Sequence, residues 1–301
     1  MPGSVTRVQR LFNCGLTEFG CGLAKQLPSP HLAGNNGDPS MPQGFDRMKA
    51  PLAFCLLASV ATHALADSRL DEVLQTGTLS VCTTGDYKPY TSLRADGRYE
   101  GIDIAMAESL AKSLNANIKW VPTTWKTLMP DFLAQRCDIA VGGISVSLER
   151  QKKAFFSQPL GVDGKIPLVR CADVQRYQSV EQINQPQVRV IEPAGGTNEI
   201  FARAHLPKAQ IRLHDNVTIF DELLAGKADV MITDASEARF QQKQKPGLCA
   251  VNPERQMQYS EKAFLLPRDD VAWKSYVDQW LHLSMATGVY DGIVNQWLAA
   301  P

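Results

Sequence analysis

The sequence predicts an α/β fold in which helices cover sheets of mainly parallel strands. Short apolar runs rich in β-branched residues alternate along the chain with segments whose apolar residues recur at helical spacing. Such alternation is typical of parallel sheets that are covered by helices. The chain has 301 residues, and the part that we expect to fold, about 235 residues, is long enough for two small lobes.

The expected strands and helices follow one another through most of the chain. The strands are expected at residues 79–83, 118–121, 138–144, 188–191, 211–213 and 230–233. The helices are expected at residues 104–114, 128–135, 197–204, 219–225, 271–286 and 290–297. Ligands of parallel sheets bind at the carboxyl ends of the strands. The candidate site residues are therefore expected within residues 86–87, 142–150, 195–199 and 233–234.

The first 66 residues are not expected to belong to this fold. Residues 48–66 have the charged start, short apolar core and small-residue exit of a secretory signal peptide, so the mature protein is expected to begin near Asp67. The apolar core is shorter than the roughly 20 residues of a membrane span, and no permanent membrane anchor is expected. Residues 1–47 are rich in Gly, Pro, Ser and Asn. We interpret them as a disordered, non-native extension upstream of a true start at Met48, and a genuine disordered extension is the alternative.

Charge and motifs exclude several classes of function. The chain has 31 basic and 31 acidic residues and no basic stripe, which argues against nucleic-acid binding. No GxSxG, GxGxxG or Walker A motif follows a strand. His205, His214 and His282 have no metal-binding spacing, so neither a metal nor a cofactor is expected. The sequence leaves the oligomeric state open, a homo-oligomer included.

The most informative segment is the glycine-rich turn at residues 195–199, which follows a β-rich run and opens a helix. The free N–H groups and the positive dipole end of a helix N-terminus favour an anion. Glu199 adds an acid to this turn. A site that only holds an anion gains little from a second negative charge, whereas a site that protonates a leaving group needs an acid. The alternative is a glutamate that caps the helix.

Seven motifs occur in order along the mature chain. They are residues 84–90, 101–107, 143–150, 155–159, 196–199, 226–229 and 233–235. In this set the chain resembles the polar-amino-acid periplasmic solute-binding proteins, family 3. The resemblance implies a two-lobed type 2 periplasmic-binding-protein fold, each lobe a sheet flanked by helices, with two crossover strands and a ligand in the cleft. Residues 67–167 and 251–301 would form lobe 1, and residues 168–250 would form the inserted lobe 2.

Within that family the chain most resembles the periplasmic cyclohexadienyl dehydratases. The supporting stretches are residues 83–89, 143–145, 148–151, 163–167, 195–199, 215–220 and 276–282. Those enzymes convert prephenate into phenylpyruvate and arogenate into phenylalanine, with loss of water and CO2. Transport-linked relatives commonly carry Pro where this chain has Leu148, and they usually lack Lys165 together with Asn198 and Glu199. The resemblance therefore implies a periplasmic lyase. The alternative is a binding protein of an amino-acid ABC transporter without catalysis.

The resemblance also implies roles for single residues around a small-molecule substrate. Arg150 would hold a carboxylate with its planar fork, with Gly143, Ser145 and Thr197 as further donors to that carboxylate. Arg150 could instead form a surface ion pair, and Ser145 could cap a strand end. Asp234 would bind the amino group that arogenate has and prephenate lacks, or it would cap the helix that begins at Ala235.

The remaining implied contacts concern the rest of the ligand. Asp86, Tyr87 and Trp125 would line it, although aromatic residues also pack in clefts without touching a ligand. Lys165 would be a second cation for a dianionic substrate, or a solvated lysine. Asn198 would be a neutral donor, or a helix cap. Glu199 would be the general acid for the departing hydroxyl group.

Four cysteines follow the expected signal peptide. Cys82 and Cys137 lie in or beside apolar strand patterns, and we interpret them as buried thiols. Cys171 and Cys249 flank the inserted lobe that the resemblance implies. Both ends of that lobe join the same hinge, so these two cysteines are expected to lie close together and form a disulfide in an oxidising compartment.

Overall fold

The computed structural model describes residues 68–298, which lie in one compact unit. The predicted upstream extension and signal peptide lie outside the described residues. Within residues 68–298, none of the helices combines the length and the apolar character that a membrane crossing requires.

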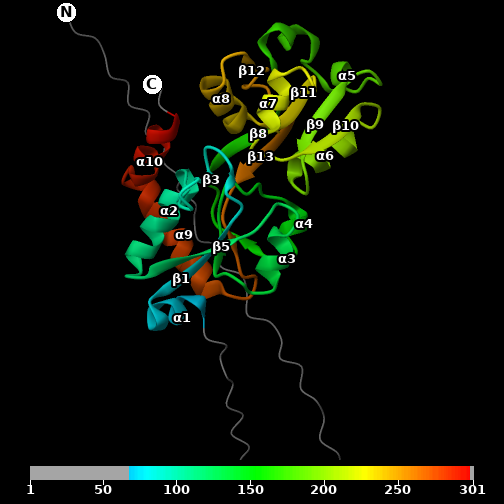
Figure 1. Ribbon diagram of the computed structural model, residues 1–301. Coiled ribbons are helices and arrows are strands. Elements are labelled where there is room, and N and C mark those ends of the chain that lie inside the picture. The colour runs from blue at the N-terminus through cyan, green and yellow to red at the C-terminus, as the bar shows by residue number, and fades with distance from the viewer. Residues whose placement is uncertain (1–67, 299–301) are drawn as a thin grey trace, which may run out of the picture. The chain divides into compact units, whose positions relative to one another are not determined.

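The chain has the predicted two-lobed α/β fold (Figure 1). The sheet of the first lobe has the strand order β5-β1-β6-β14-β7, and β1 is parallel to both of its neighbours. Its strands are β1 (Thr78–Thr83), β5 (Asn117–Pro122), β6 (Ile139–Ala140), β7 (Phe155–Phe156) and β14 (Leu265–Leu266). A small antiparallel sheet adds β2 (Asp86–Tyr87), β3 (Thr91–Leu93) and β4 (Tyr99–Glu100). The helices of this lobe are α1 (Arg69–Thr76), α2 (Ile102–Ser113), α3 (Leu128–Leu133), α4 (Leu148–Gln151), α9 (Val271–Ala286) and α10 (Val289–Leu298).

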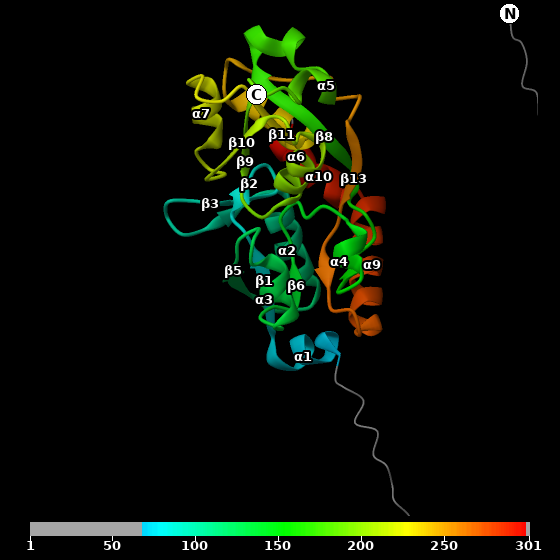
Figure 2. The same cartoon turned by 90° about the vertical axis from the view of Figure 1, so that its right-hand side faces the viewer.

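The second lobe has its own sheet, with the order β10-β9-β11-β8-β12 and with β13 also paired to β8. Its strands are β8 (Gly161–Arg170), β9 (Arg189–Pro193), β10 (Gln210–His214), β11 (Val230–Asp234), β12 (Leu248–Ala250) and β13 (Gln258–Lys262). Its helices are the 3-10 helix η1 (Cys171–Arg176), α5 (Val180–Ile183), α6 (Thr197–His205), α7 (Ile219–Leu224) and α8 (Ala235–Gln244). Figure 2 shows α5, α6 and α7 around the strands of the second sheet, with α9 beside the first lobe.

Each sheet buries both of its faces, because successive side chains of a strand point to opposite sides. In the first lobe, Val81 packs with α2 and α9, whereas the adjacent Cys82 packs with α3. In the second lobe, Leu168 and Val169 of β8 divide in the same way between two separate cores. The near-continuous apolar strands that the sequence shows are therefore those of sheets with helices on both faces.

Two long strands connect the lobes. β8 follows β7 of the first lobe and enters the second sheet, and β13 returns from the second lobe to β14. The two strands pair antiparallel, and a Cβ at Gly164 would lie 2.4 Å from the carbonyl oxygen of Gln258. Only glycine allows this approach at the junction of the lobes. The predicted lobe boundaries at residues 168 and 250 lie near the ends of β8 and β12 and stay a prediction.

Most predicted elements are found within one or two residues of their expected bounds, and α9 has the predicted bounds. The strand predicted at 138–144 is wrong in length, because β6 contains only Ile139 and Ala140. Gly142 and Gly143 follow with φ of 123° and 71°, which turns the chain away from the sheet. That turn places the backbone N–H groups of Gly142 and Gly143 within hydrogen-bond distance of the carboxylate of Asp103.

The four cysteines among the described residues form two disulfides. Cys171 and Cys249 are joined, with their Cα atoms 4.8 Å apart. The interpretation of Cys82 and Cys137 as buried thiols is wrong, because they form the second disulfide, with Cα atoms 5.7 Å apart. β1 and β6 are neighbours in the sheet, which brings Cys82 close to Cys137, two residues before β6 begins. This register could not be seen in the sequence.

Replacing Cys171 and Cys249 together by Ser is expected to lower the free energy of unfolding by about 2–4 kcal/mol, because the disulfide restricts the unfolded chain. Urea unfolding without reductant measures the change. Alkylation of protein from an oxidising compartment, followed by mass spectrometry, is the direct check. Full alkylation of both thiols before reduction would contradict the bridge.

Candidate active site between the lobes

The carboxyl ends of strands from both lobes meet at one cavity, as parallel sheets require of a ligand site. Its lining combines residues of the two lobes: Tyr87, Trp125, Gly143, Ser145, Pro193, Gly196, Thr197, Asn198, Asn216 and Asp234. A larger hollow of about 610 Å³ adjoins it and shares Trp125, Ser145 and Thr197, and Arg150 and Lys165 also line it. The structure thus brings nine of the predicted site residues to these two cavities. Asp86 and Glu199 line neither.

Arg150 is placed by local structure. Ser147 caps α4 and accepts a hydrogen bond from the backbone N–H of Arg150, which starts the helix at the right point. The guanidinium is nine-tenths buried, and its Nη1 donates to the carbonyl oxygen of Ser145 at 2.8 Å. Among residues 68–298 no carboxylate forms an ion pair with it. Burial lowers the pKa of Arg150 to about 10, so the guanidinium stays charged at neutral pH without a partner carboxylate among these residues.

A buried carboxylate holds the turn after β6, so the N–H of Gly143, which was predicted to bind a ligand carboxylate, is already bonded within the protein. Asp103 of α2 accepts hydrogen bonds from the N–H groups of Gly142 and Gly143 at 2.9 and 2.7 Å. Burial raises the pKa of Asp103 to about 6 despite these bonds. A Cβ at Gly143 would lie 2.6 Å from the ring of Tyr87, so glycine is required beside this aromatic residue. Asp103 was not among the predicted site residues.

Asp234 lies at the end of β11 between two buried lysines. Lys165 Nζ is 2.8 Å from its Oδ1, and Lys262 Nζ is 2.5 Å from its Oδ2. Tyr87 donates its hydroxyl to the same Oδ2 at 2.5 Å. Burial alone would raise the pKa of Asp234, but the two lysine charges and their hydrogen bonds outweigh it and hold that pKa well below its usual range. Asp234 is the N-cap residue of α8, yet its side chain makes no capping hydrogen bond.

Lys165 is fully buried and links three groups of the second lobe. Its Nζ donates to Thr197 Oγ1 at 2.9 Å and to Asn198 Oδ1 at 2.5 Å, besides Asp234. The interpretation of Lys165 as a solvated lysine is therefore wrong. Burial lowers the pKa of Lys165 from its ordinary value. Asn198 makes no helix-capping bond but donates to Thr233 Oγ1 at 3.2 Å.

Glu199 has the contacts of a capping residue. Its Oε2 accepts from the backbone N–H of Gly195 at 2.6 Å, and its Oε1 accepts from Arg203 Nε at 2.7 Å. The hydrogen bond from Gly195 is the main cause of a lowered pKa at Glu199, to which Arg203 and the nearby Lys126 also contribute. The carboxyl group is thus ionised at neutral pH without a substrate. The backbone of Lys126 packs closely against Gly195: a Cβ atom at position 195 would lie only 2.7 Å from the Cα of Lys126.

Aromatic residues form one wall of the cavity. Tyr87 stacks on Tyr90 with ring centroids 5.6 Å apart, and Trp125 meets Tyr87 edge-on at 5.4 Å. Asp86 lies beside this wall. Its backbone carbonyl oxygen, rather than its carboxylate, contacts the second lobe and accepts a hydrogen bond from Asn216 at 2.7 Å. Burial raises the pKa of Asp86. The lobes are therefore in contact beside the aromatic wall.

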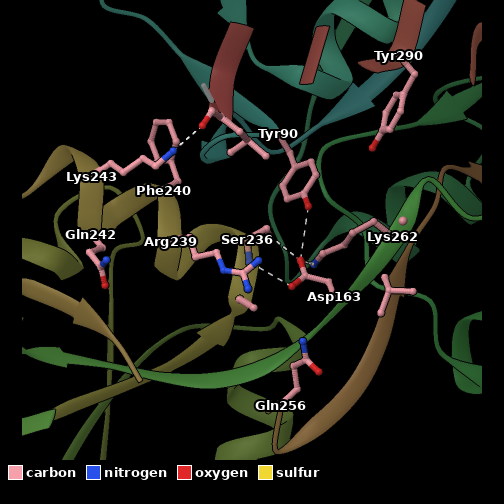
Figure 3. Close-up of a pocket in the computed structure, with 14 residues that line it drawn as sticks. Tyr90, Asp163, Ser236, Arg239, Phe240, Gln242, Lys243, Gln256, Lys262 and Tyr290 are labelled. Carbon is pink, nitrogen blue, oxygen red and sulfur yellow. Dashed lines mark hydrogen bonds and ion pairs between the residues drawn. The ribbon is translucent and has the colours of Figure 1, made fainter. Parts of the chain in front are cut away.

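Lys262 is a further site residue that was not predicted from the sequence. It is 2% exposed, and its Nζ also lies 3.0 Å from Ser145 Oγ and 5.0 Å from the ring centroid of Tyr87. Figure 3 shows Lys262 beside Asp163, whose Oδ2 lies 4.0 Å from its Nζ, and both residues line a second cavity of about 480 Å³. Asp163 there accepts from Ser236 and from Tyr90. No local motif marks Lys262, because its partners are up to 175 residues away.

Two further buried carboxyl groups lie beneath the site. Burial raises the pKa of Glu237 to about 8 and that of Glu192 well above its usual range. Glu237 accepts from the hydroxyl of Thr233, which in turn accepts from Asn198. Among the described residues, no group of three or more His, Cys, Asp and Glu side chains could hold a metal ion.

Glu237→Gln is expected to stabilise the protein increasingly as pH rises. The folded-state pKa of Glu237, about 8, exceeds the ordinary 4.5. Between these values the unfolded chain releases a proton that the folded chain keeps, so this group lowers stability by at most about 1.4 kcal/mol per pH unit. Urea unfolding between pH 5 and pH 8 measures the difference, with Glu108→Gln on the surface as control. A stability difference independent of pH would contradict the buried proton.

The space enclosed between the lobes is small. The cavity around Asp234 has a volume of about 20 Å³, which is room for about one water molecule. Thr197 Oγ1 and Ser145 Oγ approach to 3.5 Å across it. A six-membered ring with two carboxylates therefore reaches these groups only when the lobes or their side chains move apart.

Sequence comparison defines the class of protein to which this fold and site belong. The family of bacterial extracellular solute-binding proteins, family 3, matches residues 79–300, and the chain belongs to that family.

Particular relatives narrow the comparison. The chain is 49% identical over 259 residues to a cyclohexadienyl dehydratase of Pseudomonas aeruginosa, which covers 86% of this chain and 96% of the relative. It is similar to the crystal structure of an ancestral amino acid-binding protein described as a precursor of cyclohexadienyl dehydratase, with a TM-score of 0.72, 34% identity and coverage of 77% and 100%. A structure of an ancestral cyclohexadienyl dehydratase matches with a TM-score of 0.50, 50% identity and coverage of 78% and 98%.

Proposed function

We propose that this chain is a cyclohexadienyl dehydratase, a lyase that converts prephenate into phenylpyruvate and arogenate into phenylalanine with loss of water and CO2. The 49% identity to the Pseudomonas enzyme over nearly its whole length supports this proposal. The structural observation that carries it is Arg150, a buried cation without an anionic partner at the mouth of a cavity. Such a group favours a ligand that brings a carboxylate.

Two buried lysines lie near Arg150, and the buried carboxylates of Asp234 and Asp163 pair with them. Arg150 and Lys165 line the same hollow, and Lys262 lies behind Ser145. Prephenate carries two carboxylates, one on the ring and one on the side chain. We infer that Arg150 anchors one of them together with Ser145 and Thr197, while the lysines and the N–H groups at the start of α6 balance the second charge.

The reaction is an elimination whose products are set by the substrate. The C–COO⁻ bond breaks, its electron pair enters the ring, and the hydroxyl group on the opposite carbon leaves as the ring becomes aromatic. One proton is consumed, because hydroxide leaves as water and the carboxylate leaves as CO2. The protein must therefore donate a proton to the hydroxyl group and free the departing carboxylate from its water shell.

We assign the proton donor to Glu199. Glu199 lies in the first turn of α6, next to Asn198 in sequence, and its carboxylate accepts from the N–H of Gly195, a residue that lines the larger hollow. Its lowered pKa in the free protein means that substrate binding must raise it. Burial by the closing lobes and the two charges of prephenate both act in that direction.

The proposed location is the periplasm. Membership of an extracellular family supports export, and residues 48–66 have the pattern of a cleavable signal peptide. The lobes are proposed to comprise residues 67–167 with 251–301, and residues 168–250.

Mixing the purified protein with prephenate and following phenylpyruvate tests the function. Formation of phenylpyruvate at a rate proportional to protein concentration is expected. The spontaneous reaction without protein is the control. Tight binding of an amino acid without turnover of prephenate would favour the alternative, a binding protein of a transporter.

A further inference from the structure

The cavity of about 480 Å³ beside Lys262 is separate from the candidate active site. Of the residues that the structure describes, none lines both this cavity and either of the two cavities around the candidate active site. Helix α8, the connecting strands β8 and β13, and Tyr90, Tyr290 and Leu298 of the first lobe line it. Its volume is in the range of small-molecule sites. Because Arg239 of its lining is exposed, solvent reaches the cavity with the lobes as they stand.

Aromatic side chains form the apolar part of this cavity. Tyr90 of the first lobe and Phe240 of α8 are 8% and 6% exposed. Tyr290 of α10 is a third ring in the lining and packs against the cluster that contains Tyr90. Three aromatic rings around one space offer flat apolar surfaces, which favour a ligand that itself has a ring.

Two cations of α8 border the same space. Arg239 and Lys243 are four residues apart, so they lie on one face of the helix. Lys243 Nζ donates to the carbonyl oxygen of Leu298 at 2.5 Å, and it pairs with no carboxylate within residues 68–298. Arg239 pairs through Nη2 with Glu254, whose side chain is 88% exposed. Such an exposed ion pair contributes little, and the other N–H groups of the guanidinium have no partner in the described part of the chain.

The hydroxyl group of Tyr290 is a further donor. It makes no hydrogen bond to another described residue, and in Figure 3 it points toward Tyr90 and Lys262. Burial raises the pKa of Tyr290, and so do nearby carboxylates, so the hydroxyl keeps its proton at neutral pH.

The buried carboxylate of this lining is already balanced. Asp163 accepts from Ser236 Oγ at 2.5 Å and from the N–H of Gly164 at 2.9 Å, and Lys262 Nζ lies 4.0 Å from it. Asp163 therefore leaves Lys243 as a cation that a ligand anion can pair with.

We propose that this cavity is a second ligand site, which takes a small aromatic carboxylate. The ring lies between Tyr90, Phe240 and Tyr290, and the carboxylate accepts from Lys243 and Arg239. Both cations and Phe240 belong to α8, so these contacts stay together when the lobes move. The proposal goes beyond the proposed function and holds whether or not the protein turns over prephenate.

Calorimetry with phenylacetate, which has one ring and one carboxylate, tests the site. We expect phenylacetate to bind at least ~10-fold more tightly than acetate, which lacks the ring, and than 2-phenylethanol, which lacks the carboxylate. Lys243→Met removes a charged donor and is expected to weaken phenylacetate binding at least ~10-fold. Lys227→Met, at a surface lysine paired with Glu222, is the matched control and should keep the parental affinity. Undetectable binding at millimolar phenylacetate, or parental affinity in Lys243→Met, would overturn the proposal.

A second measurement distinguishes this cavity from the candidate active site, which also favours carboxylates. In protein that carries Arg150→Lys, phenylacetate is expected to bind still, and adding Lys243→Met is expected to weaken that binding at least ~10-fold. A crystal structure with 4-bromophenylacetate locates the ring through the anomalous signal of bromine, which is expected between Tyr90 and Phe240. Bromine found beside Trp125 alone, or binding that Arg150→Lys abolishes, would place the ligand in the candidate active site and contradict the second site.

Discussion

Glu199→Gln is expected to slow turnover of prephenate at least ~10²-fold while the substrate still binds. Gln keeps the size of the side chain and a hydrogen-bonding carbonyl, so it can still accept from the N–H of Gly195. It cannot give an acidic proton to the departing hydroxyl group, and positioned proton donation contributes about 10²–10⁴-fold. Binding should be unchanged or tighter, because one negative charge near the dianion is removed.

The pH dependence of the same variant is the sharper readout. Without substrate the hydrogen bond from Gly195 lowers the pKa of Glu199, so the free carboxyl group is ionised at neutral pH. If the bound substrate raises that pKa, turnover by the parent falls as pH rises above the bound-state value, because the acid form is lost. The residual rate of Glu199→Gln should lack this fall. Glu222→Gln on the surface of the second lobe is the matched control.

Single-turnover rates at saturating prephenate measure both effects. Equal turnover numbers for the parent and Glu199→Gln would contradict the assignment and return Glu199 to the capping role that its contacts show. Lys165 would then be the next candidate, since it lines the larger hollow and burial lowers its pKa.

Arg150→Lys is expected to raise KM for prephenate at least ~10-fold although the charge is kept. A buried, charge-assisted hydrogen bond contributes about 1.5–3 kcal/mol, and the ammonium group cannot present two parallel N–H donors to a carboxylate. The bond from Nη1 to the carbonyl oxygen of Ser145 would also be lost in its present geometry.

Steady-state kinetics and calorimetry with phenylpyruvate measure the loss of binding. Arg212→Lys, at an arginine about half exposed and paired with Glu222, is the control and should leave KM unchanged. Parental KM and kcat in Arg150→Lys would show that Arg150 is not the carboxylate anchor.

The sequence predicted those parts of the molecule that depend on local pattern. The periodicity of α9 and the apolar runs of β1 and β11 are strong, and the positions at which strands end located most of the cavity lining. The sequence did not predict contacts between residues that are distant in the chain. Lys262 lies in a short, polar strand and acquires its role only because β13 returns beside β8. The pairing of Cys82 with Cys137 depends in the same way on the order of strands.

The ion pairs of Asp234 could not be predicted from the sequence either. The residue stands at the end of an apolar strand and before a helix, which made an open ligand contact and a helix cap the natural interpretations. Its two buried lysine partners come from residues 69 and 28 positions away. No short sequence pattern predicts that a carboxylate at a strand end is already paired with buried lysines of the same chain.

The two disulfides divide between the lobes. The disulfide between Cys82 and Cys137 joins β1 to the segment just before β6 in the first lobe, while the one between Cys171 and Cys249 joins the 3-10 helix η1 to β12 of the second lobe. Neither of these cross-links ties one lobe to the other. The disulfides therefore stabilise each lobe separately. They do not restrain the movement of the lobes relative to each other that must admit a substrate. In this chain the stability of each lobe and the opening between the lobes are therefore separate properties, and each can be altered without the other.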